Sequence, residues 1–229
     1  MLYGETEVRD NIRNREGKRV FYLGKGDQLT ASARDWLTRE RISILPAEQA
    51  KPERWRLLSG GFVEGKPEHM THLNGEVLVM KTHPRIAFRG AMDTLESILM
   101  LCQLYAGENW VEPVGEILAL ARKIIRCDVL ETPLRQEKLC GLTEDQQRQR
   151  SHFPQDHYGQ PHFMPEVTDG VTVLWLNRAR TAARAAELAA VEAWTNRDGK
   201  LIREDIPQTL NRLSSMLYIL MIRAKKEKS

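Results

Sequence analysis

The sequence lacks several features that would define its class at once. Its 229 residues include only three cysteines, Cys102, Cys127 and Cys140, which stand far apart without CxxC spacing. This excludes an ordinary zinc finger and a disulfide framework, and it is typical of a protein from a reducing compartment. The N-terminus has no apolar signal core, and no apolar run comes near the roughly 18 residues of a membrane-spanning helix. We therefore expect a cytoplasmic protein with no membrane partner.

A strong charge of one sign is also missing. The net charge of +3 is too small to indicate a nucleic-acid or membrane-surface partner. With 41% hydrophobic and 28% charged residues, the composition is that of a globular chain and excludes disorder as the main state. Basic residues gather locally instead. Arg223, Lys225, Lys226 and Lys228 at the C-terminus are interpreted as a solvated helix end that suits the helix macrodipole.

The chain is predicted to have two parts, a small N-terminal α/β segment with a linker over residues 1–66 and a helical-bundle domain over residues 67–229. Pro46–Pro67 contains three prolines and a Gly-Gly pair, and it is interpreted as a linker or irregular segment. The N-terminal pattern indicates strand, helix and strand in turn: Arg19–Leu23, a helix capped by Thr30 or Ser32 that runs to about Glu40, and Ile42–Leu45.

After Met70 the apolar spacing is helical. We expect a mainly α protein, an up-and-down bundle of four to five helices with the small N-terminal strand-helix-strand segment. The connection Glu131–Val167 is too long for a plain loop, and connections of this length in a compact domain are usually functional. The predicted long helices are Ile86–Tyr105, Val111–Cys127, Val171–Trp194, and Asp205 to about Ala224.

The third of these helices carries the most informative pattern, NRARTAARAAE. Asn177, Arg180, Arg184 and Glu187 follow one another at steps of three, four and three, so they share one face of the helix. The opposite face is almost entirely alanine and can approach a neighbouring helix closely. Two guanidiniums one turn apart bind the oxygens of a polyphosphate in pairs, and Glu187 can fix an arginine or hold Mg²⁺. The alternative is ordinary surface pairing between residues four apart.

Other polar residues leave two interpretations open. Asn211, Ser214 and Ser215 lie beside the leucine seam of the last helix, where they either bond between helices or contact a sugar hydroxyl. Asp93 lies in an otherwise apolar stretch and requires a cationic partner, for example an arginine of the third long helix. The loop histidines His152, His157 and His162 do not match a strong zinc signature, and we interpret them as loop or lid residues.

Three ordered motifs resemble those of the ATP:corrinoid adenosyltransferases. LNRARTAARAAE and LNRLSSMLYILMIRA resemble the two C-terminal signatures, and KTHPRIAFRGAMDTLES resembles the N-terminal one. The whole chain, including LTASARDWL, most resembles the ethanolamine-utilisation type, and the shared part covers residues 71–224. The resemblance implies a homotrimer with active sites between subunits. It also implies transfer of the 5′-deoxyadenosyl group of ATP to cob(I)alamin, with Mg²⁺, to give adenosylcobalamin and triphosphate.

The resemblance further implies partners and residue roles. It suggests a reductase, a cobalamin-dependent lyase and association with a bacterial microcompartment. The implied roles are Arg180, Arg184 and Glu187 for triphosphate and magnesium, Asn211 for ribose, Thr71 and Lys81 for phosphate, Asp93 for an arginine across the subunit interface, Phe163 for displacing the lower ligand of the corrinoid, and Ser215 for the corrin.

The sequence also departs from this family. Ser215 stands where many relatives have aspartate, and His83 occupies a place often taken by aspartate. The ethanolamine type usually has a histidine followed by a metal-binding cysteine cluster, but residues 52–70 contain no cysteine. We therefore predict activity without a bound structural transition metal. The competing hypothesis is a non-catalytic helical scaffold or adaptor. A carboxylate-metal bundle is disfavoured because the helices carry no Glu-x-x-His pair.

Overall fold

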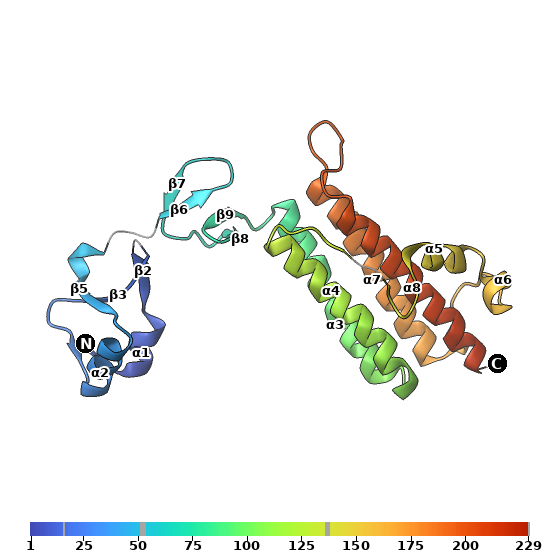
Figure 1. Ribbon diagram of the computed structural model, residues 1–229, viewed down its shortest axis with the longest axis horizontal. Helices are drawn as coiled ribbons and strands as arrows, with labels where there is room; N and C mark the ends of the chain where they lie inside the picture. The colour runs from blue at the N-terminus through green and yellow to red at the C-terminus, as the bar shows by residue number, and fades with distance from the viewer. Residues whose placement is uncertain (16, 51–53, 136–137, 229) are drawn as a thin grey trace. The chain divides into compact units, whose positions relative to one another are not determined.

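The computed structural model describes residues 1–15, 17–50, 54–135 and 138–228 and divides the chain into two compact units (Figure 1). The first unit consists of Met1–Trp55 with Phe62–Lys66, and the second consists of Arg56–Gly61 with Pro67–Ser229. The helices of the described residues all lack the combination of length and apolar composition that a membrane crossing requires.

The first unit is a small α/β fold. Thr30 caps its main helix by accepting a hydrogen bond from the Ala33 backbone N–H (3.2 Å), and the helix joins two parallel strands that pair directly. The predicted strand-helix-strand segment is therefore confirmed. Its elements are β1 (Leu2–Tyr3), α1 (Glu5–Asp10), β2 (Arg13–Arg15), β3 (Lys18–Leu23), β4 (Gln28–Leu29), α2 (Ala31–Arg39), β5 (Ser43–Pro46), η1 (Ala47–Gln49) and β7 (Phe62–Glu64).

The second unit begins with strands, and here two sequence predictions were wrong. The stretch interpreted as irregular contains β6 (Arg54–Leu57), whose last two residues pair with β9 (Val77–Met80). The stretch after Met70 is a hairpin of β8 (Met70–Asn74) and β9, not a helix. Its two turn residues are Gly75 and Glu76, and Gly75 has the positive φ (45°) that tight hairpin turns require at their first position. Val77, Leu78 and Val79 are buried, so this short apolar run packs as a strand.

Four long helices form the core of the second unit, which confirms the predicted mainly α bundle. The rings of Phe88, early in the first, and Trp194, at the end of the third, lie 4.9 Å apart. Tyr105 and Trp175, at the opposite ends of the same helices, stack at 5.6 Å. These two helices are therefore antiparallel. The four are α3 (Pro84–Tyr105), α4 (Glu108–Val129), α7 (Val171–Trp194) and α8 (Asp205–Lys228), the last one turn longer than expected.

The long connection crosses the bundle. Gln103 of α3 donates to the Val111 carbonyl near the start of α4 (2.8 Å), and Arg122 farther along α4 donates to Glu96 (3.3 Å), so α3 is antiparallel to α4 as well. Helices α4 and α7 therefore run in the same direction, and the chain between them must return along the bundle. This connection contains α5 (Glu144–His152), α6 (Pro154–Tyr158) and η2 (Val167–Asp169). Thr143 and Gln146 form a capping box that starts α5, and both α5 and α6 pack against α8 (Figure 1). The expected functional segment is thereby placed beside the last helix.

A buried charge cluster ties α3 to α4. The Asp128 side chain is fully buried and accepts hydrogen bonds from Nε of Arg85 (2.9 Å) and Nε of Arg89 (2.6 Å). Arg85 also donates to the Glu131 carboxylate (3.0 Å), which accepts a second bond from Asn74 of β8 (2.8 Å). The cluster connects the hairpin and both helices at one end of the bundle.

His83 forms the N-cap of α3. Its Nδ1 accepts a hydrogen bond from the Arg85 backbone N–H (3.2 Å), and Pro84 occupies the first helical turn. Burial, together with the charges of Arg85 and Arg89, lowers the pKa of His83, which favours the unprotonated ring that this bond requires. An aspartate would accept the same bond, so the substitution noted in the sequence preserves the capping role.

Candidate functional site

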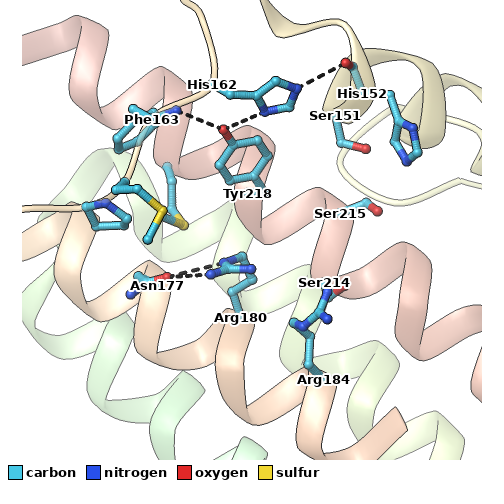
Figure 2. A pocket seen from close by; sticks show the side chains of 13 residues that line it. Ser151, His152, His162, Phe163, Asn177, Arg180, Arg184, Ser214, Ser215 and Tyr218 are labelled. Carbon is cyan, nitrogen blue, oxygen red and sulfur yellow. Dashed lines mark hydrogen bonds between the residues drawn. The ribbon is translucent and has the colours of Figure 1, made fainter. Parts of the chain in front are cut away.

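A pocket of about 640 Å³ opens between α7, α8 and the chain that follows α5 (Figure 2). This volume is in the usual range of roughly 300–1,000 Å³ for small-molecule sites. The pocket mixes cationic, hydroxyl and apolar groups. Its lining consists of Ser151, His152, His162, Phe163, Met164, Pro165, Asn177, Arg180, Arg184, Ser214, Ser215, Tyr218 and Met221.

Helix α7 presents its polar stripe to this pocket. Asn177, Arg180 and Arg184 line it, and Figure 2 shows their side chains following one another along the helix. The alanine face opposite is buried, which confirms the predicted packing face and lets α3 and α8 lie against α7. Its residues, each at most 5% exposed, are Ala179, Ala182, Ala183, Ala186 and Ala190.

Among the described residues, the two arginines have no carboxylate partner. Nε and Nη2 of Arg180 both donate to Oδ1 of Asn177 (3.2 and 3.0 Å), which is a neutral amide. Over the described part of the chain, neither Arg180 nor Arg184 forms an ion pair with a carboxylate. Burial, and then the positive charge of Arg184, lower the pKa of Arg180, although a guanidinium keeps its charge in proteins. The pocket therefore holds two like charges that an anion with several oxygens would neutralise.

Glu187 and Asn211 connect α7 to α8 one turn beyond Arg184. Nδ2 of Asn211 donates to Oε1 of Glu187 (3.0 Å), and Arg212 donates to Oδ1 of Asn211 (2.8 Å). Ser214 donates to the Asn211 carbonyl (2.9 Å). Asn211 therefore makes a hydrogen bond between the two helices, whereas the bond of Ser214 stays within α8. Glu187 and Asn211 lie beside the pocket lining and not within it.

Besides α7 and α8, residues 162–165 form a third wall of the pocket, and hydrogen bonds centred on Tyr218 hold this wall in place. The Tyr218 hydroxyl accepts from the Phe163 backbone N–H (3.4 Å) and lies 3.0 Å from Nδ1 of His162. Nε2 of His162 lies 3.1 Å from the His152 carbonyl, which can only accept, so Nε2 carries the proton (Figure 2). In the neutral ring Nδ1 then accepts from Tyr218. These bonds fix residues 162 and 163 to both α5 and α8.

The C-terminal lysines also hold this wall. Their interpretation as a solvated helix end fits the exposed Arg223, Lys226 and Lys228, but Lys225 is partly buried. Lys225 forms an ion pair with Asp169 of η2 (2.6 Å), and Lys226 donates to the Tyr158 carbonyl (3.1 Å). The hydrogen bond from Lys225, and a second one from the Glu166 backbone N–H, lower the pKa of Asp169. The last turns of α8 therefore bind the connecting segment along much of its second half.

Three other predicted site residues lie outside the pocket of the single chain. Thr71 belongs to β8, and Lys81 follows β9, where its Nζ is 3.9 Å from the Glu68 carboxylate, with both side chains exposed. Asp93 is exposed on α3. Within the ranges that the structure describes, Asp93 makes no ion pair, so the proposed pairing with an arginine of α7 does not occur inside one chain.

Sequence reasoning missed Tyr218, although a signal was present. Tyr218 follows Ser214 and Ser215 by four and three residues, which places all three on one face of α8. Of the loop histidines, His152 and His162 reach the pocket. No three His, Cys, Asp or Glu side chains among the described residues are grouped as metal ligands. The prediction about transition metals stays a prediction.

Comparison with known proteins identifies the family. The family described as cobalamin adenosyltransferase matches residues 62–224. The corrinoid adenosyltransferase EutT of Salmonella typhimurium is 30% identical over 95% of this chain and 90% of its own length. The EutT of Escherichia coli gives the same identity and coverage. The expected resemblance is confirmed: the chain belongs to the cobalamin adenosyltransferase family and is similar to its EutT members along nearly its whole length.

Proposed function

We propose that this chain transfers the 5′-deoxyadenosyl group of ATP to cob(I)alamin. Cobalt(I) supplies the electron pair for the new bond to C5′, the C5′–O bond breaks with its electrons, and triphosphate leaves. The products are adenosylcobalamin and triphosphate. One observation carries the proposal: a member of this family holds Arg180 and Arg184 side by side in a pocket, without a carboxylate partner in the described chain.

The protein's task on the ATP side is to hold the leaving group. Arg180 and Arg184 bind the triphosphate and stabilise the charge that develops on it. Two hydrogen bonds to Asn177 already hold the Arg180 guanidinium, which limits its reorganisation. Glu187 would hold Mg²⁺ through the same phosphates, because Mg²⁺ is usually bound by one or two carboxylates together with substrate phosphates. Its Oε1 accepts from Asn211, which keeps the carboxylate oriented. Asn211 would contact the ribose.

The protein's task on the corrinoid side is to exclude the lower ligand. Phe163 is half-buried in the pocket wall, where its ring would occupy the lower axial position, and Ser215 would contact the corrin. A vacant axial position makes reduction to cobalt(I) easier. Phe163→Ala should therefore reduce the rate from cob(II)alamin more than the rate from chemically prepared cob(I)alamin. Equal reductions would mean that another residue excludes the ligand.

Three of the proposed site residues, Thr71, Lys81 and Asp93, lie outside the pocket of a single chain, which supports a homotrimer. Arg184 precedes Trp194 by ten residues, about 15 Å along the axis of α7. Trp194 contacts Phe88, and Lys81 lies seven residues before Phe88, near that distant end of the bundle. We propose that Thr71, Lys81 and Asp93 of the partner subunit complete each pocket.

Subunit mixing tests this arrangement. Lys81→Ala and Arg184→Ala should each be inactive alone, and refolding them together should restore activity, because some mixed trimers then contain one intact site. Absence of restored activity in mixed trimers would contradict a shared site. We further propose a reductase that supplies cobalt(I), a cobalamin-dependent lyase that uses the product, and a cytoplasmic location associated with a microcompartment, with no nucleic-acid partner.

Thermal unfolding with ATP and Mg²⁺ tests the binding step. A saturating ligand at about one hundred times its Kd adds roughly 2.7 kcal/mol to the free energy of unfolding. Wild type should show this stabilisation and Arg184→Ala should lose it. The matched control is Arg178→Ala, because Arg178 is exposed on the same helix outside the pocket lining. A wild type that neither responds to ATP nor forms adenosylcobalamin would favour the scaffold hypothesis.

A further inference from the structure

The Phe163 ring is held at the pocket by side chains of α8. Residues 160–166 belong to no helix or strand, so regular backbone hydrogen bonds do not fix them. The ring of Phe163 stacks on that of Tyr218, with centroids 6.1 Å apart and planes at 26°. The ammonium of Lys225 lies 4.3 Å from the Phe163 ring centroid. Tyr218 and Lys225 are seven residues apart, two helical turns, and therefore share one face of α8.

The position of Lys225 is itself fixed. Oδ1 of Asp169 pairs with the ammonium at 2.6 Å, and Oδ2 of the same carboxylate accepts from the Glu166 backbone N–H (2.8 Å). The two side chains are only 27% and 8% exposed, so solvent screens the pair less than it screens a surface ion pair. Asp169 therefore binds both the Glu166 backbone, which follows Phe163, and the Lys225 ammonium, which lies over the Phe163 ring.

We propose that Lys225 is a positioning residue: oriented by Asp169, it holds the Phe163 ring in the orientation that displaces the lower ligand of the corrinoid. This inference rests on the proposed function. Lys225 is not among the residues that line the pocket, so its effect passes through Phe163. A lysine that only stabilised the fold would affect every corrinoid substrate equally.

The first experiment compares two forms of the substrate with the full-length protein. Lys225→Met keeps the length of the side chain but removes its charge, and the rate from cob(II)alamin with a reductant should fall about tenfold, the effect of a partly desolvated cation–π contact. The rate from chemically reduced cob(I)alamin should stay close to that of wild type. Lys225→Arg should restore the cob(II)alamin rate, because arginine also places a cation over an aromatic ring. Asp169→Asn should behave like Lys225→Met.

Lys226→Met is the matched control. Lys226 holds the same segment through the Tyr158 carbonyl, whereas it is Lys225 that lies over the Phe163 ring. Lys226→Met should therefore leave the ratio of the two rates unchanged. The EPR spectrum of bound cob(II)alamin gives an independent measurement. Splitting from the lower-ligand nitrogen should be absent with wild type and should reappear with Lys225→Met.

A double-mutant cycle decides whether Lys225 acts through Phe163. In the Phe163→Ala background, Lys225→Met should cause no further loss of the cob(II)alamin rate, because the group that it positions is already gone. Additive losses, or equal losses with both corrinoid forms, would overturn the inference while leaving the proposed function intact. A wild type that forms no adenosylcobalamin from cob(I)alamin would instead overturn the proposed function itself.

Discussion

Substituting Asp128 by asparagine removes a buried negative charge from between two arginines and leaves the shape of the side chain unchanged. The carboxylate is fully buried, and Arg85 and Arg89 are only 14% and 19% exposed. The amide group introduced by the substitution would offer its NH₂ to one of the two guanidiniums, so a donor would face a donor. Arg89 would also lose the carboxylate with which it pairs, and Arg85 would keep the more exposed carboxylate of Glu131. Breaking a buried ion pair by removing one partner costs about 3–5 kcal/mol.

The assay is thermal or urea unfolding followed by far-UV circular dichroism, in which the helical unit dominates the signal. For a unit of this size, 1 kcal/mol corresponds to about 2–4 °C, so Tm should fall by roughly 6–20 °C. The matched control is Glu131→Gln. Glu131 binds the same Arg85 but its side chain is 54% exposed, and exposed pairs contribute about 0–1 kcal/mol.

Two results would refute this reasoning. One is a Tm for Asp128→Asn equal to that of Glu131→Gln, since burial would then make no difference. The other comes from replacing all three buried charges together, as in Arg85→Met, Arg89→Met and Asp128→Leu. This triple variant leaves no unpaired cation in the cluster, so it should be less destabilised than Asp128→Asn alone. The reverse order would mean that shape, and not charge, determines the stability of this cluster.

Four other outcomes are expected. Arg184→Ala should abolish adenosylcobalamin formation. It should unfold like wild type, because the Arg184 side chain is exposed. Circular dichroism and turnover measured on one sample check both results, and retained turnover would contradict the triphosphate role of Arg184. The lowered pKa of His83 means that the unfolded chain binds a proton at higher pH than the folded chain. Stability should therefore fall as pH drops below about 6.5, and His83→Asp, compared by unfolding at several pH values, should reduce that dependence. Burial raises the pKa of Cys140 to about 12, so a thiolate-selective reagent should label it slowly at neutral pH in native protein; rapid labelling would show that its loop opens. Elemental analysis of protein purified without chelator should find no stoichiometric iron or zinc, and one equivalent of either per chain would overturn that expectation.

Helical periodicity predicted the long helices well because their apolar faces are continuous. The alanine face of α7 is buried where the spacing placed it, and the predicted bounds Val171–Trp194 are those of the structure. The hairpin of β8 and β9 was missed because VLVM is a short apolar run. Such a run fits a strand and a helix equally, and Gly75, the turn residue that would have decided between them, received no weight.

Residue spacing predicted the candidate site where a single helix forms it, and the family resemblance added Phe163 and Ser215. Asn177, Arg180 and Arg184 follow from spacing along α7. The wall opposite depends on contacts between residues far apart in the sequence, such as His162 with Tyr218 and Asp169 with Lys225. Local patterns contain no information on such pairs. The helix macrodipole by itself accounts for basic residues at the end of a helix. No local pattern therefore indicated that the lysines of α8 have partners elsewhere in the chain.

The pocket differs from the rest of the helical unit in whether its charged side chains have partners of opposite charge. Elsewhere in the unit, the carboxylate of Asp128 pairs with Arg85 and Arg89, and that of Asp169 pairs with Lys225. In the pocket the opposite holds. Arg180 is half-buried beside another cation and bonds only to a neutral amide, so its pKa is lowered where pairing would have raised it. Departures from local consistency of this kind are expected at functional sites, because stability is lost there until a ligand supplies the missing charge. The buried alanines fix the α7 backbone and keep the two arginines one turn apart, so a polyanion bound between them would supply the missing charge.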